Sequence, residues 1–142
     1  MLKDLTSENL IKLNIEATDW EDAVRKAAQP LLDAGKVKQS YVDDIIVGAK
    51  ESGPYFVLAQ HVARPEAGAL ESAIGIATLK TPVEFGSEAN DPVKYLFCLS
   101  ARNNTEHLEA LADLAERLED ENFFKMLDNA TGAEEVLAYL NK

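Results

Sequence analysis

Runs of apolar residues, separated by amphipathic stretches, predict a chain of mixed strands and helices. Residues 10–15 (LIKLNI) alternate apolar and polar side chains after the first pair, which is typical of a half-buried strand. Residues 55–59, 73–79 and 93–99 are apolar or small almost throughout and predict buried strands. Helical spacing of apolar residues appears both before and after this block of strands.

Two helices are predicted before the first buried strand. Thr18 as N-cap and Glu21 at the third helical position form a T-x-x-E capping box, and the helix is expected to end at Gly35. Pro30 should bend this helix or mark its last turn. A second helix begins near residue 40 and stops at the Gly-Pro pair of residues 53–54. Its predicted apolar face consists of Val42, Ile45, Ile46 and Ala49.

Further helices are predicted after the strand at residues 93–99. A long amphipathic helix follows the polar loop 100–104, and Asp120 is expected to cap a short helix that runs through Leu127. Thr131 and Glu134 form a second predicted capping box for the last helix. The apolar stripe of the long helix is interpreted as a core face and not as a partner-binding groove: Leu108, Leu111, Ala115 and Leu118.

The order of these elements predicts an α/β fold. Helices on both sides of a block of strands favour a layered sandwich, in which helices cover both faces of a mixed sheet. We find no repeat, low-complexity segment or linker, and 142 residues fit one compact domain. Residues 1–142 are therefore expected to form a single domain.

The net charge of the chain limits the classes of molecule that it is expected to bind. With 14 basic and 25 acidic residues, the net charge is −11 at pH 7. Such a balance argues against nucleic acid and anionic membranes, and it favours basic protein partners or simple solubility. No signal-peptide core and no window of about twenty apolar residues is present. A cytoplasmic location without membrane insertion is the expectation.

Candidate chemistry is concentrated at the ends of two predicted strands. The sequence contains two histidines: His61 follows the strand at residues 55–59, and His107 follows the strand at residues 93–99. Sites in layered sheets gather at strand ends, so these imidazoles could face each other across one edge of the sheet. Arg64 lies close to His61, whereas Cys98 lies inside an apolar run and is expected to be buried and not a nucleophile.

Five segments together resemble enzyme IIA of the sugar phosphotransferase system (PTS). They are GPYFVLA at residues 53–59, RPEAG at 64–68, LKTPVEFG at 79–86, NDPVKYLFCLSA at 90–101 and TEHLEALADLAERL at 105–118. The resemblance is to the mannitol–fructose type, with the ascorbate-specific branch looking closest. It covers nearly the whole chain in the expected order.

This resemblance implies a cytoplasmic phosphocarrier, a phosphotransferase component that takes a phosphoryl group from the histidine protein HPr onto a histidine. It then hands the group to a cysteine of enzyme IIB. The implied fold has a mixed sheet of about five strands, and neither a cofactor nor a metal is implied. His107 matches the supporting second histidine of the family, and Arg64 is a phosphate-binding candidate or a structural arginine. Homo-oligomer formation is left open.

The acceptor position does not match the family pattern, in which the phosphohistidine lies in a segment Leu-Pro-His-Ala-Arg-Pro-Glu. Residues 60–66 here read QHVARPE, so alignment on Arg64 puts Val62 at the acceptor position and leaves His61 one residue early. The stretch also looks about four residues short. Three explanations remain open: a deletion, a loop missing from the sequence, or a shift that lets His61 serve. We favour loss or omission.

Loss of the acceptor leads to an alternative function. A protein that keeps the IIA fold and surface without the acceptor would be a transfer-deficient regulatory or binding module.

Other kinds of site are disfavoured by the sequence. Glu66 and Glu71 lack metal-ligand spacing and are interpreted as solvated charges. An unrelated α/β hydrolase is disfavoured because no Gly-x-Ser-x-Gly elbow is present.

Overall fold

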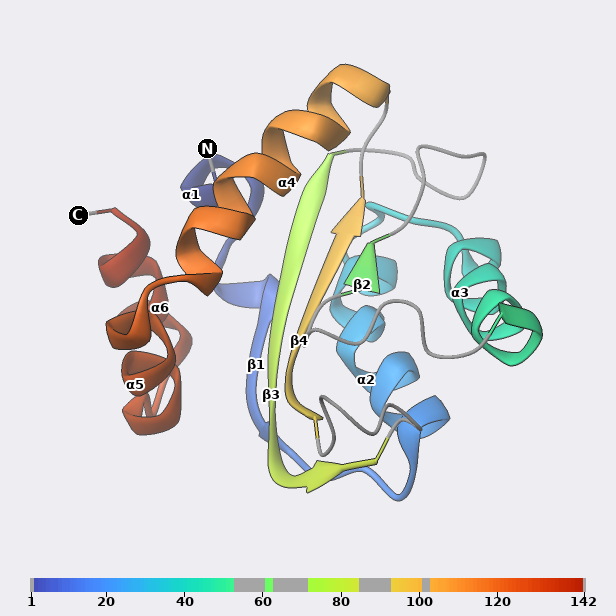
Figure 1. Cartoon of the computed structure of the whole chain (residues 1–142), viewed down its shortest axis with the longest axis horizontal. Coiled ribbons are helices and arrows are strands. Elements are labelled where there is room, and N and C mark those ends of the chain that lie inside the picture. The colour runs from blue at the N-terminus through green and yellow to red at the C-terminus, as the bar shows by residue number, and fades with distance from the viewer. Residues whose placement is uncertain (1, 53–60, 63–71, 85–92, 101–102, 142) are drawn as a thin grey trace.

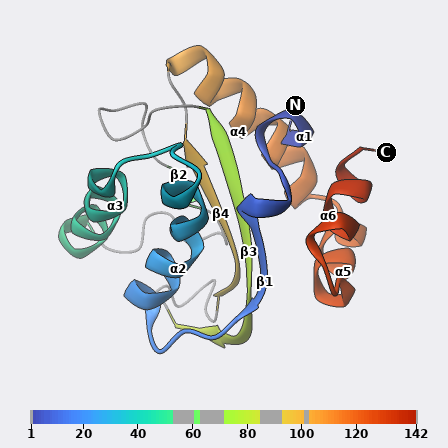
Figure 2. The same ribbon diagram turned by 180° about the vertical axis from the view of Figure 1, so that it is seen from behind.

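A mixed sheet lies between two layers of helices (Figures 1 and 2). The computed structural model describes residues 2–52, 61–62, 72–84, 93–100 and 103–141. The described strands follow the spatial order β1-β3-β4-β2. β3 is parallel to β1 and antiparallel to β4, and β2 is parallel to β4. The strands are β1 (Ile11–Ile15), β2 (His61–Val62), β3 (Ala73–Val83) and β4 (Val93–Ser100).

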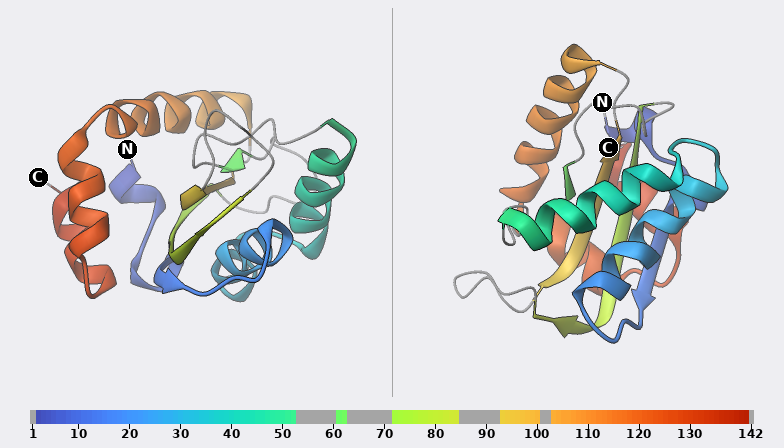
Figure 3. Two further views of the ribbon diagram at one scale, coloured as in Figure 1. Left: turned by 60° about the horizontal axis from the view of Figure 1, so that its bottom comes forward. Right: turned by 90° about the vertical axis from the view of Figure 1, so that its right-hand side faces the viewer.

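The helices divide between the two faces of the sheet (Figure 3). α2 (Trp20–Asp33) and α3 (Gln39–Ser52) pack on one face. α4 (Asn104–Leu118), α5 (Glu121–Asn129) and α6 (Ala133–Leu140) pack on the other. The four-residue α1 (Leu2–Leu5) and a short 3-10 turn, η1 (Glu8–Leu10), precede β1.

Alternation along the central strands produces a core on each face. Ile74 and Ile76 of β3 point into the α4–α6 core, whereas Ala77 and Leu79 point into the α2–α3 core. β4 alternates in the same way, so both central strands are apolar on both sides. This explains why residues 73–79 and 93–99 appear in the sequence as continuous apolar runs.

The predicted α/β fold, with helices on both faces of a mixed sheet, is confirmed. The prediction of about five strands is not: the described residues form three strands of five or more residues, together with the two-residue β2. The predicted strand at residues 55–59 lies outside the described residues. β3 is longer than predicted because residues 80–83 continue it, and Val83 pairs with Val93 of β4.

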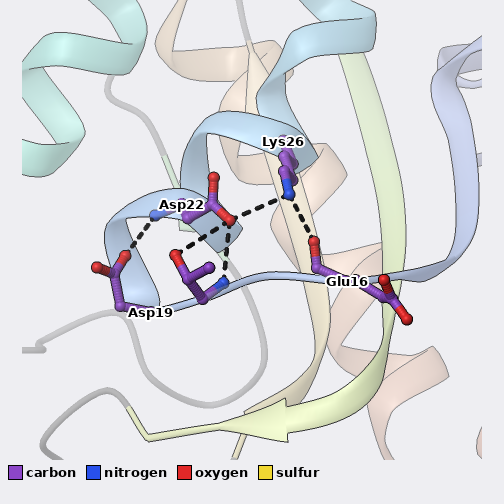
Figure 4. A network of polar contacts seen from close by, with 5 residues as sticks. Glu16, Asp19, Asp22 and Lys26 are labelled. Carbon is purple, nitrogen blue, oxygen red and sulfur yellow. Dashed lines mark hydrogen bonds and ion pairs between the residues drawn. The ribbon is translucent and has the colours of Figure 1, made fainter.

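The start of α2 lies one residue later than the predicted capping box (Figure 4). Asp19, and not Thr18, is the N-cap, and its Oδ1 accepts a hydrogen bond of 2.8 Å from the backbone N–H of Asp22. The Asp22 carboxylate in turn accepts one of 3.0 Å from the Thr18 N–H. Glu21 makes neither of these two hydrogen bonds. Asp19 and Asp22 fill the capping roles that the sequence pattern assigned to Thr18 and Glu21.

The last helix shows the same displacement by one residue. α6 is capped at Gly132 and not at Thr131, and the carboxylate that accepts from the backbone N–H groups of Thr131 and Gly132 belongs to Glu135. The predicted Glu134 is not the capping acid. Asp120 does cap α5, as predicted, through a 2.9 Å hydrogen bond from the Asn122 N–H.

The buried stripe of α4 differs from the predicted one. Ala110 and Leu114 are buried against the sheet, whereas Leu108 is 65% exposed and Ala115 is exposed as well. Leu111 and Leu118 lie at the edge of both stripes, and they pack against the α4–α6 core. The prediction of a core face at Leu108 is therefore wrong: the helix is rotated about its axis so that Leu108 faces solvent.

A bulge interrupts β1 at Asn14. This residue has φ of 56°, and its N–H donates a 2.8 Å hydrogen bond to Thr78 Oγ1 of β3. The pairing register with β3 shifts between Lys12 and Ile15. As a result Leu13 packs on the α4–α6 side and Ile15 on the α2–α3 side, which simple alternation in LIKLNI does not predict.

Gly75 provides a test of how closely α2 approaches the sheet. A Cβ at this position would lie 3.6 Å from the Ala27 carbonyl oxygen and 3.6 Å from Leu31 Cγ, both in α2. We therefore expect Gly75→Ala to be tolerated, whereas the branched side chain of Gly75→Val should lower the free energy of unfolding by about 1–3 kcal/mol through overpacking. Urea unfolding of both variants measures this, and equal stability of the two would contradict the close approach.

A polar contact ties β4 to α5 and gives a pH-dependent stability. Lys94 Nζ and Tyr95 Oη each donate a 2.7 Å hydrogen bond to Asp128 Oδ1. Partial burial disfavours the charged form of Asp128, but the hydrogen bonds from Lys94 and Tyr95 outweigh it, so the pKa of this carboxyl is lowered.

A lowered folded-state pKa stabilises the fold above the unfolded value, which for aspartate is about 3.9, and this contribution disappears as the pH falls through the folded value. Asp128→Asn should therefore be less stable than the wild type near neutral pH, by no more than about 1 kcal/mol because the pair is partly exposed. The difference should shrink toward zero in acid. Unfolding curves across this pH range measure it, and a difference that grew on acidification would refute the assignment.

Candidate functional site

The candidate site lies at the end of the sheet where β4 leads into α4 (Figure 1). β2 and β4 are parallel, so their carboxyl ends point the same way, and β3 begins at this end because it is antiparallel to β4. Ser100, the last residue of β4, is buried and pairs with Ala73, the first residue of β3. Three strand ends and one helix start therefore meet here.

The two-residue strand β2 carries His61 to this end. His61 is paired in register with Cys98 of β4, and Val62 is paired with Leu99. β2, at the edge of the described sheet, therefore carries both His61 and Val62, the residue that alignment on Arg64 puts at the acceptor position.

The first turn of α4 carries the second histidine. Asn103 is the N-cap, and its Oδ1 accepts a 2.9 Å hydrogen bond from the backbone N–H of Glu106. His107 is the next residue along the helix. The free N–H groups and the dipole at a helix start favour anions, so this position suits a residue that assists a phosphoryl group.

A side-chain contact connects β3 to this turn. Ser72, directly before β3, donates a hydrogen bond from Oγ to Glu106 Oε2. Ser72, Asn103 and Glu106 are not among the site residues predicted from the sequence. The spacing Asn103-x-x-Glu106 is itself a helix-start signal, and it could have revealed the cap within the loop assigned to residues 100–104.

Buried groups fix the strand ends beneath the site. Tyr41 of α3 is buried and donates a 2.7 Å hydrogen bond from its hydroxyl to the Leu99 carbonyl oxygen. Burial raises the pKa of the Cys98 thiol to about 12, so this cysteine stays protonated near neutral pH. The prediction that Cys98 is a buried strand residue is confirmed.

The structure places both predicted histidines at the same end of the sheet but describes neither side chain. His61 and His107 lie on elements that meet at the same end of the sheet. Arg64, Glu66 and Glu71 lie outside the described residues. Within the described ranges, no group of three or more His, Cys, Asp or Glu side chains is arranged to hold a metal ion. No helix in this part of the chain is long and apolar enough to cross a membrane.

A shallow hollow lies at the other end of the sheet, lined in part by Lys26 and Lys80. Both ammonium groups already have acidic partners. Lys26 Nζ lies 3.1 Å from Asp22 Oδ2 and donates a 2.7 Å hydrogen bond to the Glu16 carbonyl oxygen (Figure 4). Lys80 Nζ lies 3.3 Å from Glu16 Oε1. These pairs neutralise the hollow, which is therefore poorly suited to bind an anion.

The cap of α4 can be tested independently of activity. Asn103→Ala removes the acceptor for the Glu106 N–H and should lower the free energy of unfolding by about 1 kcal/mol, whereas Asn103→Asp keeps an acceptor and should cost much less. Amide hydrogen exchange should speed up in the first turn of α4 in the alanine variant. Equal exchange in both variants would show that the cap does not hold this turn.

Comparisons with known proteins identify the family of this chain. Residues 4–142 match the family model described as phosphoenolpyruvate-dependent sugar phosphotransferase system, EIIA 2. A relative named ascorbate-specific PTS system EIIA component, from Salmonella typhimurium, is 35% identical over 143 residues, which include 97% of this chain and 93% of the relative. A relative of the same name from Shigella sonnei is 35% identical over 147 residues, at 99% and 96% coverage.

Solved structures agree with this match. The Escherichia coli mannitol-specific cryptic phosphotransferase enzyme IIA has a TM-score of 0.86 and 29% identity, covering 97% of this chain and 98% of that one. The enzyme IIA of the Escherichia coli complex between mannitol enzyme IIA and phosphorylated enzyme IIB has a TM-score of 0.79 and 28% identity, with 96% coverage of both chains. The chain therefore belongs to the EIIA type 2 family of the phosphoenolpyruvate-dependent sugar phosphotransferase system.

Proposed function

We propose that this protein is a cytoplasmic phosphocarrier of a sugar phosphotransferase system and that residues 1–142 form a single enzyme IIA domain. It would accept a phosphoryl group from phospho-HPr on a histidine and pass it to a cysteine of enzyme IIB. The observation that carries the proposal is that the family match spans residues 4–142. The solved complex of a related enzyme IIA with phosphorylated enzyme IIB supports enzyme IIB as the partner.

The proposed chemistry is two successive phosphoryl transfers. A neutral imidazole nitrogen of this chain attacks the phosphorus of phospho-HPr, so a new N–P bond forms while the N–P bond to HPr breaks and its electron pair returns to the HPr imidazole. A thiolate of enzyme IIB then attacks the same phosphorus, and an S–P bond replaces the N–P bond. No metal or cofactor takes part in this scheme.

The roles of the site residues follow from charge. During transfer, negative charge is spread over three equatorial oxygens, and the protein stabilises it with positioned donors. His107, in the first turn of α4, would supply an imidazole N–H together with the favourable field of the helix start. Arg64 would add charge-assisted hydrogen bonds. His61 is the acceptor candidate in the chain as it stands.

The length of the acceptor loop is part of the proposal. The match to the Salmonella typhimurium relative runs over 143 positions but includes only 97% of this 142-residue chain, so some of its positions face gaps in this chain. Such gaps are compatible with a loop about four residues short between His61 and Arg64. If the acceptor is lost with them, the protein is a binding or regulatory module that keeps the IIA fold.

Phosphorylation by the donor proteins tests both versions. Incubation with enzyme I, HPr and radiolabelled phosphoenolpyruvate should label a histidine of this chain, and the label should move to enzyme IIB when that protein is added. His61→Ala should abolish labelling if His61 is the acceptor. A matched variant with Leu-Pro-His-Ala inserted between Ala63 and Arg64 restores the family-like loop.

The two variants separate the possible outcomes. Labelling of the wild type that is lost in His61→Ala establishes His61 as the acceptor. Labelling of the inserted variant alone shows that the short loop removed the acceptor and favours the regulatory module. Labelling of neither protein, with both folded, would refute the phosphocarrier proposal.

A further inference from the structure

One hydrogen bond joins two parts of the candidate site that lie 34 positions apart in the chain. Ser72 stands directly before β3, whose first residue, Ala73, pairs with Ser100 at the end of β4. The Ser72 hydroxyl donates to Glu106 Oε2 in the first turn of α4, and both side chains are half-buried. The contact therefore fixes the start of β3 to the start of α4, at the end of the sheet where the site lies (Figure 1).

Glu106 is held by two anchors of different origin. Its backbone N–H donates a 2.9 Å hydrogen bond to Asn103 Oδ1, which belongs to the cap of its own helix. Its carboxylate accepts the hydrogen bond from Ser72, which belongs to the entry of a strand. His107 is the next residue, so the turn that carries this histidine is anchored both along the helix and across to β3.

The Glu106 carboxylate is a negative charge of the chain itself, in the turn that the proposed function places against the phosphoryl group. Free N–H groups and the dipole at a helix start attract any anion, and an acidic side chain at the third helical position, which Glu106 occupies, can reach back to such N–H groups. A freely moving carboxylate would compete with a phosphoryl group for these donors and repel its charge. The hydrogen bond from Ser72 directs the carboxylate toward the start of β3 instead.

We infer that Ser72 is a positioning residue for phosphoryl transfer: its hydroxyl holds the Glu106 carboxylate at the start of β3 and keeps the helix start beside His107 open to the phosphoryl group. The inference rests on the proposed function, because it assigns a further residue to the same transfer site. Ser72 acts through Glu106 and takes no part in making or breaking bonds.

The rate of label transfer from phospho-HPr tests this role. It is measured in the wild type or, if only that chain takes up label, in the variant with Leu-Pro-His-Ala inserted. Ser72→Ala frees the carboxylate and should lower the rate at saturating phospho-HPr about tenfold, with little change in the phospho-HPr concentration that gives half the maximal rate. Ser72→Thr keeps a hydroxyl donor and should keep most of the rate.

A second substitution separates the charge of Glu106 from its hydrogen bond. Glu106→Gln keeps an oxygen that can accept from Ser72 but removes the charge. If Ser72 acts by controlling the charge, Ser72→Ala should have no effect on the rate in a chain that also carries Glu106→Gln. A hydrogen bond with a purely structural role would be lost in both backgrounds, so Ser72→Ala would then slow transfer equally in each.

Tyr139→Phe is the matched control for a loss of stability. The Tyr139 hydroxyl also donates to a carboxylate, that of Asp120, but this contact joins α6 to the start of α5, beyond the other end of α4. Its removal should destabilise the fold about as much as Ser72→Ala does and leave the transfer rate unchanged. Urea unfolding measures the stability of each variant.

The possible results distinguish this inference from the proposed function. A rate loss in Ser72→Ala that Ser72→Thr avoids, and that disappears in the Glu106→Gln background, supports the inference. An unchanged rate in Ser72→Ala, an equal loss in the Glu106→Gln background, an equal loss in Tyr139→Phe, or a change confined to the half-saturating concentration overturns it while the phosphocarrier proposal stands. Absence of label in both the wild type and the inserted variant, with both folded, refutes the phosphocarrier proposal and overturns the inference with it.

Discussion

Burial of β3 and β4 on both faces is the constraint on which the rest of the structure depends. These strands pair antiparallel from Ala73↔Ser100 to Thr78↔Tyr95, and their side chains alternate between two closed cores. Because both faces must be covered, helices are required on each side. The first helix of the second face, α4, follows β4 directly and therefore begins near the carboxyl end of that strand, which is where the candidate site forms.

The site is accordingly held by secondary structure on more than one side. α3 contributes the Tyr41 hydroxyl to the Leu99 carbonyl oxygen, β3 contributes Ser72 to Glu106, and Asn103 caps the turn that carries His107. Phosphoryl transfer depends mainly on positioning and charge stabilisation, so anchored strand ends beside a helix start suit that chemistry. The exposed side of the same helix, which includes Leu108, faces solvent.

Sequence patterns predicted the elements better than their details. Continuous apolar runs predicted β3 and β4 correctly, because a strand that is buried on both faces has apolar side chains at nearly every position. Asp120 correctly marked the start of α5. Two capping boxes were displaced by one residue, since several Thr, Asp and Glu side chains near each helix start can satisfy the same rule. The stripe of α4 was misplaced because its small apolar residues fit more than one face.

The sequence by itself determined the layered α/β class, the burial of Cys98 and the two histidines available for chemistry, because composition and periodicity carry this information directly. Only the tertiary structure decided that Asn14 bulges from β1, that Ser72 meets Glu106 across 34 positions, and that Leu108 faces solvent. These features depend on strand register and on the rotation of a helix about its axis. Both are set by packing between segments that are distant in the sequence, so local patterns do not contain them.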